Sequence, residues 1–187
     1  MTIADFYSPV SKTRSDIYNV ALVLSGSILL ALSAQIEFFL PFSPVPVTGQ
    51  TFAVLFLGLM LGSKRGALAV MAYLLEGSAG LPVFSGGGTG AAHLVGPTGG
   101  YLIGFIAAAF MTGSLAERGW DKKPSTAALA AILGEMSIYL FGLPWLGVFV
   151  GFDNILVVGM LPFLPGAILK ISLLMLVFPF AWKAMKK

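Results

Sequence analysis

The sequence predicts an all-α integral membrane protein that crosses the bilayer about six times. Hydrophobic residues make up 57% of the 187 residues, charged residues make up only 10%, and the mean hydropathy is +0.92. Soluble domains carry about a quarter charged residues, so this composition is not that of a soluble fold. Six crossings of roughly 20 residues each would use about two thirds of the chain and leave only short loops. We therefore expect residues 1–187 to form a single membrane domain.

The first predicted helix covers residues 18–40. This segment is apolar up to Gln35 and Glu37, and it is followed by prolines at positions 41, 44 and 46. Proline has no amide hydrogen and clashes with the preceding turn, so it ends a helix. The segment before residue 18 is too polar for a cleavable signal peptide, so we expect this helix to remain in the mature protein.

Two shorter apolar runs follow at residues 50–61 and 66–76. One continuous helix would bury Lys64 and Arg65 in the membrane, so two helices joined by a turn are favoured. Each run is shorter than the roughly 17 residues that a perpendicular span needs. We therefore expect loops that dip toward the membrane to cap these helices and to leave a cavity on one side.

The segment at residues 77–100 is rich in glycine and contains the triplet Gly86, Gly87 and Gly88. Glycine lets backbone amides approach a ligand closely, but glycine-rich segments also serve as flexible connectors. Apolar residues such as Phe84 and Leu94 would be unnecessary in a free connector. They favour an ordered lid over the cavity.

Three more helices are predicted at residues 98–115, 126–141 and 165–183. The second of these is expected to be interrupted near Gly142 and Pro144, and a loop containing Asp153 leads to the third. Proline is well tolerated in the first turn of a helix, so Pro165 suits the start of the last one.

The basic residues predict the orientation. With the N-terminus in the cytoplasm, six crossings place ten of the eleven basic residues on the cytoplasmic side. The positive-inside rule then puts both termini in the cytoplasm of a multi-pass protein of the plasma (inner) membrane. The ten residues are Lys12, Arg14, Lys64, Arg65, Arg118, Lys122, Lys123, Lys183, Lys186 and Lys187.

The eleventh basic residue, Lys170, is predicted near the outer end of the last helix. A lysine there could hold an anionic substrate, reach the lipid headgroups, or pair with Glu135, the other charge well inside a predicted helix. We favour substrate binding, because no other cation lies on that side. Both residues are candidates for the substrate site.

Gln50, Tyr101 and Asp153 are further candidates for substrate binding. Gln50 could direct its amide into the cavity, Tyr101 could stack on a ligand, and Asp153 could exchange hydrogen bonds with a polar ring. Each also has an ordinary interpretation: Gln50 as a residue of the first helical turn, Tyr101 in the interfacial aromatic belt, and Asp153 as a solvated loop charge.

Several functional classes lack their sequence signatures. The chain has no cysteine and one histidine, so no metal site or cofactor is expected. It contains no hydrolase, metalloprotease or P-loop motif, so neither an enzyme nor an ATPase is predicted. The net charge of +3 is explained by topology, and no nucleic-acid partner is expected.

Five segments carry a family resemblance: PVPVTGQT from residue 44, GLPVFSGGGTG from residue 80, VGPTGGYLIGF from residue 95, IYLFGLPWL from residue 138 and LPFLPGAILK from residue 161. In this order they resemble the BioY family, the biotin-specific S components of energy-coupling-factor (ECF) importers. The resemblance implies biotin as substrate, and as partners a transmembrane coupling protein and two ATPase subunits. It assigns Lys170 and the glycine-rich segment to the substrate site. The family's usual Pro-Gly-Asp-x-x-Lys pattern is broken by Ala167.

Small residues four apart on the first helix form a candidate partner surface, since close helix packing in lipid needs small side chains. Packing within the bundle would use the same spacing. The main alternative function is a stand-alone secondary transporter or channel for another small anionic solute, although the two halves show no convincing repeat. The small residues are Ala21, Ser25, Ser27 and Ala31.

Overall fold

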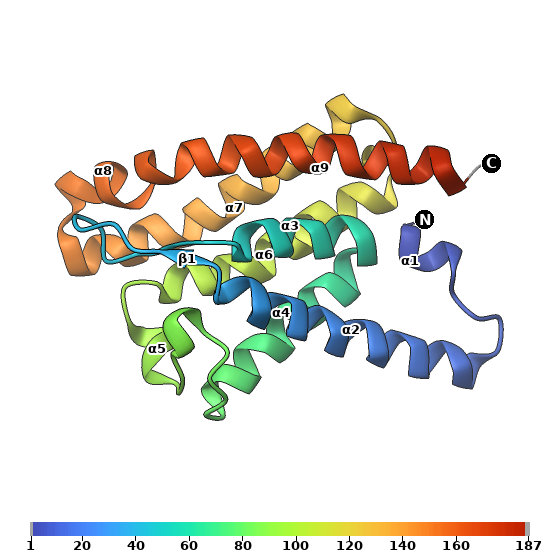
Figure 1. The fold of residues 1–187 in the computed structure, drawn as a ribbon, viewed down its shortest axis with the longest axis horizontal. Coiled ribbons are helices and arrows are strands. Elements are labelled where there is room, and N and C mark those ends of the chain that lie inside the picture. The colour runs from blue at the N-terminus through green and yellow to red at the C-terminus, as the bar shows by residue number, and fades with distance from the viewer. Residues whose placement is uncertain (1, 186–187) are drawn as a thin grey trace.

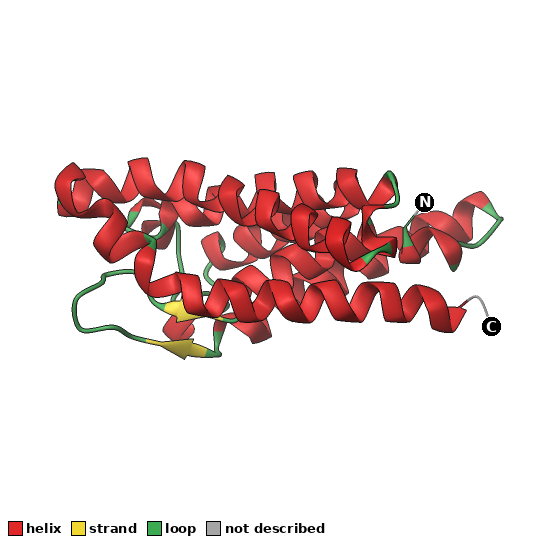
Figure 2. Ribbon diagram, turned by 90° about the horizontal axis from the view of Figure 1, so that it is seen from above, coloured by secondary structure: helices red, strands yellow, loops and turns green. Residues whose placement is uncertain are grey.

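The computed structural model describes residues 2–185 and is almost entirely helical (Figures 1 and 2). Lys186 and Lys187, which the charge argument included, lie outside the described residues. The longer helices run roughly parallel or antiparallel to one another in an elongated bundle. They are α2 (Lys12–Ala34), α3 (Gln50–Leu61), α4 (Ser63–Ser78), α6 (Gly99–Glu117), α7 (Pro124–Val150) and α9 (Leu164–Met185).

Within the described part of the chain, four stretches are long and apolar enough to cross a membrane by length and composition: α2, α6, α7 and residues Phe152–Met185, which include α9. Helix α3 is apolar but shorter. Many large apolar side chains on these helices point outward, as expected where lipid is the solvent. The prediction of a mostly helical membrane protein is confirmed, whereas six crossings, the orientation and the lid stay predictions.

Several helix boundaries differ from the predicted ones, most of all in α2, which begins at Lys12 where residue 18 was predicted, and in α7. Helix α2 ends at Ala34, because the chain then turns into a short antiparallel pair of strands, β1 (Glu37–Phe38) and β2 (Val47–Thr48). An interruption was predicted near Gly142 and Pro144, but helix α7 continues through Pro144 to Val150. Proline removes one backbone hydrogen bond, and a long helix held on both sides of that position can absorb this loss.

Glycines set how closely the helices pack. A Cβ on Gly104 of α6 would lie 3.0 Å from the Ile138 backbone of α7, and a Cβ on Gly113 would overlap the backbone of Ser63. Small residues of this kind allow helix backbones to approach each other in a membrane. They hold α6 at the centre of the bundle, against α3, α4 and α7.

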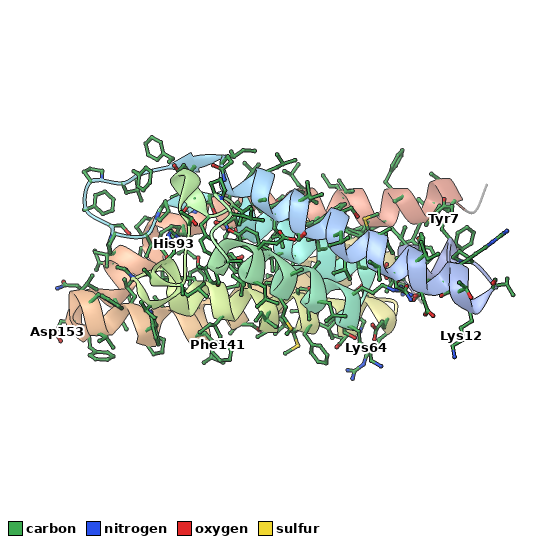
Figure 3. All side chains as sticks on the ribbon, turned by 90° about the horizontal axis from the view of Figure 1, so that it is seen from below. Tyr7, Lys12, Lys64, His93, Phe141 and Asp153 are labelled. Atoms are coloured by element: carbon green, nitrogen blue, oxygen red, sulfur yellow. The ribbon has the colours of Figure 1, made fainter. Side chains whose placement is uncertain are left out.

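Both described chain ends lie at one end of the bundle, together with Lys12 and Lys64 (Figures 1 and 3). The short helix α1 (Ile3–Phe6) is tied there by Asp5, whose carboxylate accepts a hydrogen bond from Arg65 at 2.7 Å. Burial alone would raise the pKa of Asp5, but hydrogen bonds from Thr2 and Arg65 outweigh burial and hold the pKa below its usual value.

A second contact at this end joins α9 to η2 (Trp120–Lys122). The Trp182 indole N–H donates to the buried Asp121 carboxylate, and the Lys122 ammonium lies 4.6 Å from the centre of the Trp182 ring. Burial raises the pKa of Asp121 above its usual value. The opposite end of the bundle carries η1 (Ser85–Gly87), α5 (Ala92–Val95), α8 (Ile155–Gly159) and the strand pair.

Candidate functional site

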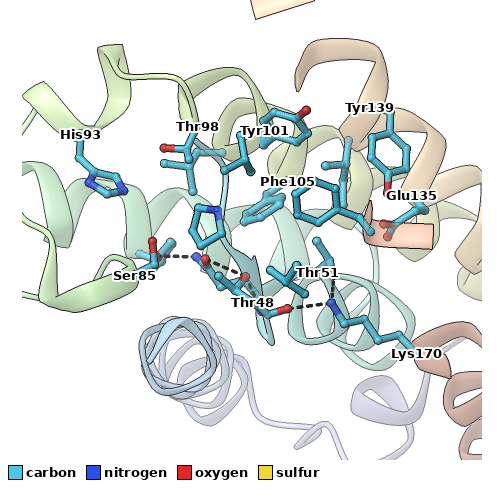
Figure 4. A pocket seen from close by; sticks show the side chains of 18 residues that line it. Thr48, Thr51, Ser85, His93, Thr98, Tyr101, Phe105, Glu135, Tyr139 and Lys170 are labelled. Carbon is cyan, nitrogen blue, oxygen red and sulfur yellow. Dashed lines mark hydrogen bonds between the residues drawn. The ribbon is translucent and has the colours of Figure 1, made fainter. Parts of the chain in front are cut away.

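A pocket opens inside the bundle toward the end opposite the chain termini (Figure 4). Its empty space, including the mouth, is about 650 Å³. The apolar wall includes Leu102, Phe105 and Ile138, and polar groups reach it from both sides. An apolar cavity with a few placed polar groups is the usual form of a small-molecule site.

Lys170 of α9 directs its ammonium group into this pocket. The Nζ atom donates to the Thr48 carbonyl oxygen at 2.7 Å and to the Thr51 hydroxyl at 2.6 Å. An ammonium has three donors, so one remains for a ligand. The ammonium is held inside the protein by these two bonds, which argues against a lipid anchor.

Glu135 of α7 lines the same pocket as Lys170 and is only 7% exposed. Among the described residues it forms no direct ion pair with Lys170, although the two opposite charges interact electrostatically. Glu135 Oε2 and the hydroxyl of Tyr139, one helical turn further on, have no hydrogen-bond partner within the described part of the chain. Glu135 therefore partly offsets the charge of Lys170, as the alternative of a Glu135–Lys170 pair had anticipated, although without direct contact.

Gln50 and Tyr101 also line the pocket, but their polar groups are already engaged. The Gln50 side-chain N–H donates to the Tyr73 hydroxyl at 2.7 Å, and the Tyr101 hydroxyl donates to the Gly159 carbonyl at 2.9 Å. Both therefore shape the wall and offer a ligand mainly their apolar surface.

The glycine-rich segment is ordered by aromatic contacts. Phe84 is fully buried, and its ring stacks on His93 at 4.7 Å between ring centroids and meets Tyr73 edge-on at 5.4 Å. Burial lowers the pKa of His93, so its imidazole is neutral at pH 7. The Trp145 indole N–H donates to the Gly96 carbonyl at 2.9 Å and joins the end of the segment to α7.

Four predicted site residues do not line the pocket: the glycine triplet of this segment, and Asp153 in the loop after α7. Ser85 and His93 supply the pocket wall there, in place of Gly86, Gly87 and Gly88. Asp153 is exposed in η3 (Phe152–Asn154), outside the pocket. Because the segment is anchored by Phe84, Ser85 and His93 face the pocket and the glycine triplet does not. Glycine content alone does not predict this.

Further pocket residues were not singled out as site residues from the sequence. These are Thr51, Tyr73, Thr98, Tyr139 and Phe163, together with Ser85 and His93. Thr51, Tyr73 and Tyr139 lie within long helices rich in apolar residues, where spacing gives little indication of which face points inward. The other four lie in short helical turns or a loop. The clearest available signal was that Tyr139 lies four residues after Glu135, on the same helix face.

The four small residues of α2 do not share one environment. Ala21 and Ser25 are exposed, whereas Ser27 is fully buried and donates to the Glu76 carboxylate at 2.9 Å. Ala31 packs against the core. Packing within the bundle therefore accounts for Ser27 and Ala31, and only Ala21 and Ser25 remain available to a partner.

Comparison with known proteins assigns the chain to a family. The model of the BioY family matches residues 9–187. The chain belongs to the BioY family. It is 40% identical over 151 residues to a probable biotin transporter BioY of Pyrococcus horikoshii, covering 81% of this chain and 88% of that protein. It is 38% identical over 159 residues to the biotin transporter BioY of Rhizobium etli, covering 81% and 85%.

A solved structure shares the fold. The crystal structure of the S-component for biotin from an ECF-type ABC transporter matches with a TM-score of 0.80 over 94% of this chain and 95% of that chain, at 23% identity. At this identity the match establishes the fold. Together with the apolar helices, BioY membership makes this chain a multi-pass protein of the plasma membrane.

Proposed function

We propose that this BioY protein is the substrate-specific subunit of an ECF importer and that it binds biotin. The single observation that supports this most strongly is the Lys170 ammonium, which enters a largely apolar pocket and uses two of its three donors within residues 2–185. Named relatives are biotin transporters, and the structural match is to a biotin S-component. The protein would act by binding and translocation, without covalent chemistry.

Biotin suits this pocket chemically. It is a small apolar bicycle with one carboxylate and one cyclic urea, so it needs an apolar wall, one strong donor and a few polar partners. Phe105 and Ile138 supply apolar surface, and Lys170 supplies a charged donor to an oxygen of the ligand. We infer that the glycine-rich segment and the strand pair close over the bound ligand.

Six crossings with cytoplasmic termini are the topology we propose. Helices α3 and α4 would act as short spans, with the turn at Lys64 and Arg65 in the cytoplasm. The chain ends and these two basic residues share one end of the bundle, while the pocket lies toward the other end. The positive-inside rule then places the pocket on the external side.

This topology is testable because the chain has no natural cysteine. A cysteine introduced at Gly87 should react with a membrane-impermeant thiol reagent in intact cells, whereas one at Ser11 should react only after the cells are permeabilised. Both residues lie outside the long helices, so both are sterically accessible once their side of the membrane is reached. The opposite labelling pattern would contradict the proposed orientation.

Energy for uphill transport would come from partner subunits, since the sequence contains no P-loop. We propose a transmembrane coupling protein and two ATPases as these partners, with Ala21 and Ser25 of α2 contacting the coupling protein. Their small side chains would allow a partner helix to approach closely.

Uptake of radiolabelled biotin tests this function. Cells unable to make biotin should accumulate it against a gradient when they express the chain with a coupling protein and two ATPases, and this accumulation should stop when ATP is depleted. Uphill accumulation by the chain alone, driven by an ion gradient, would support the alternative of a stand-alone secondary transporter.

A further inference from the structure

Glu135 and Tyr139 form an unusual pair in the pocket wall. The Glu135 residue is 7% exposed, and among residues 2–185 neither its Oε2 atom nor the buried Tyr139 hydroxyl has a hydrogen-bond partner. Buried polar atoms are nearly always hydrogen-bonded, and leaving one unpaired is costly. The two groups interact electrostatically with each other, yet neither atom forms a well-aligned hydrogen bond within the described residues, so a ligand in the pocket can supply one.

The arrangement of the pair defines what that partner must be. Residues four apart lie on the same helix face, so a carboxylate acceptor and a hydroxyl are presented together. Figure 4 shows both side chains on the same wall of the pocket. An ionised carboxylate only accepts hydrogen bonds, while a tyrosine hydroxyl can donate one. A complementary ligand edge therefore offers an N–H donor next to a carbonyl acceptor.

We propose that Glu135 and Tyr139 are specificity-determining residues that bind the N–H and C=O groups of a cyclic urea in the substrate. This inference rests on the proposed function, because the cyclic urea is that of biotin. Glu135 accepts from a ureido N–H, and Tyr139 donates to the ureido oxygen. Lys170, in the same pocket, supplies the positive charge that makes a buried carboxylate tolerable.

Geometry separates this pair from the other polar residues of the pocket. The amide of Gln50 and the hydroxyl of Tyr101 are committed to partners within the protein. Lys170 is partly committed, to Thr48 and Thr51. Among the described residues that line the pocket, Glu135 is the only carboxylate. An ionised acceptor binds an N–H group more strongly than the neutral side chains of Ser85, His93 and Thr98, so Glu135 carries the discrimination between a urea and a ring without N–H donors.

The test compares two ligands on the purified full-length chain: biotin, and an analogue methylated on both ureido nitrogens. The variants are Glu135→Gln and Tyr139→Phe. The matched control is Glu76→Gln, which alters a carboxylate in α4 that pairs with Ser27 outside the pocket. Affinities are measured for both ligands with each protein, and gel filtration checks that each variant is folded.

We expect Glu135→Gln to weaken biotin binding roughly ten- to a hundredfold, the range for a charge-assisted hydrogen bond, and to leave binding of the methylated analogue within about twofold. Tyr139→Phe should weaken biotin binding roughly three- to tenfold. Glu76→Gln should change neither ligand's affinity. If Glu135→Gln does not fold, Tyr139→Phe still tests the pair, because the proposal requires its three- to tenfold loss on biotin.

Different outcomes would contradict different claims. For Glu135→Gln, equal losses on both ligands or no loss on either would overturn the role of Glu135. For Tyr139→Phe, which should weaken both ligands because the analogue keeps its ureido oxygen, no loss on either would overturn the role of Tyr139. Biotin binding by the unmodified chain would stand in both cases. Failure of the unmodified chain to bind biotin would overturn the proposed function, and the urea assignment with it.

Discussion

Replacing Lys170 with methionine is expected to lower biotin affinity about ten- to a hundredfold. Methionine keeps most of the apolar stem but removes the ammonium, and a hydrogen bond from a charged donor to a ligand oxygen contributes roughly 1.5 to 3 kcal/mol. The substitution also removes the hydrogen bonds to Thr48 and Thr51, so the melting temperature must be measured alongside the affinity.

The matched control for this change is Lys183→Met, in the last turn of the same helix and at the other end of the bundle. It removes the same charge far from the pocket and should leave affinity unchanged. If Lys170→Met binds biotin as tightly as the unmodified chain, Lys170 only braces the strand pair against α3, and the assigned site is wrong.

The second large effect concerns the centre of the bundle. Gly113→Ala is expected to lower stability by about 2 kcal/mol, because an added Cβ would overlap the backbone of Gly62 and Ser63. This is a net value: overpacking costs about 3 kcal/mol, and the better helix propensity of alanine returns about 1 kcal/mol. The corresponding fall in melting temperature is roughly 4 to 8 °C, measurable in detergent.

Gly166→Ala is the control for that prediction. A Cβ at Gly166 meets no atom within 4 Å, so alanine there brings only its helix propensity. Its melting temperature should stay level or rise. Equal melting temperatures for the two variants would show that α6 can move away from the turn between α3 and α4 at little cost in stability. That result would contradict the close packing of α6 described above.

Composition was enough to predict the helical membrane fold, because a stretch of some 20 apolar residues in lipid has few structures open to it. Helix ends were less predictable. The prolines after residue 40 were read as the end of the first helix, whereas α2 ends at Ala34, where the chain turns into the strand pair. Pro144 was read as an interruption, but packing of α7 against α6 carries the helix through it.

Pocket residues could be predicted from the sequence where a charged side chain lies in an apolar helix. Lys170 and Glu135 stand out in apolar helices, since a charge there needs a specific partner. Both line the pocket, whereas Asp153 and the glycine triplet do not. Tyr73 and Thr51 were missed because helices that are apolar on every side give no periodic signal for the inward face. Their positions depend on how the helices pack, which local sequence does not encode.

The most direct test of the proposed function is saturation binding of tritiated biotin to the purified chain in detergent, without ATP or partner subunits. We expect one biotin per chain, displaced by unlabelled biotin, with much weaker binding by Lys170→Met and unchanged binding by Lys183→Met. Absence of saturable binding by the unmodified, folded chain would contradict its assignment as the biotin-binding subunit.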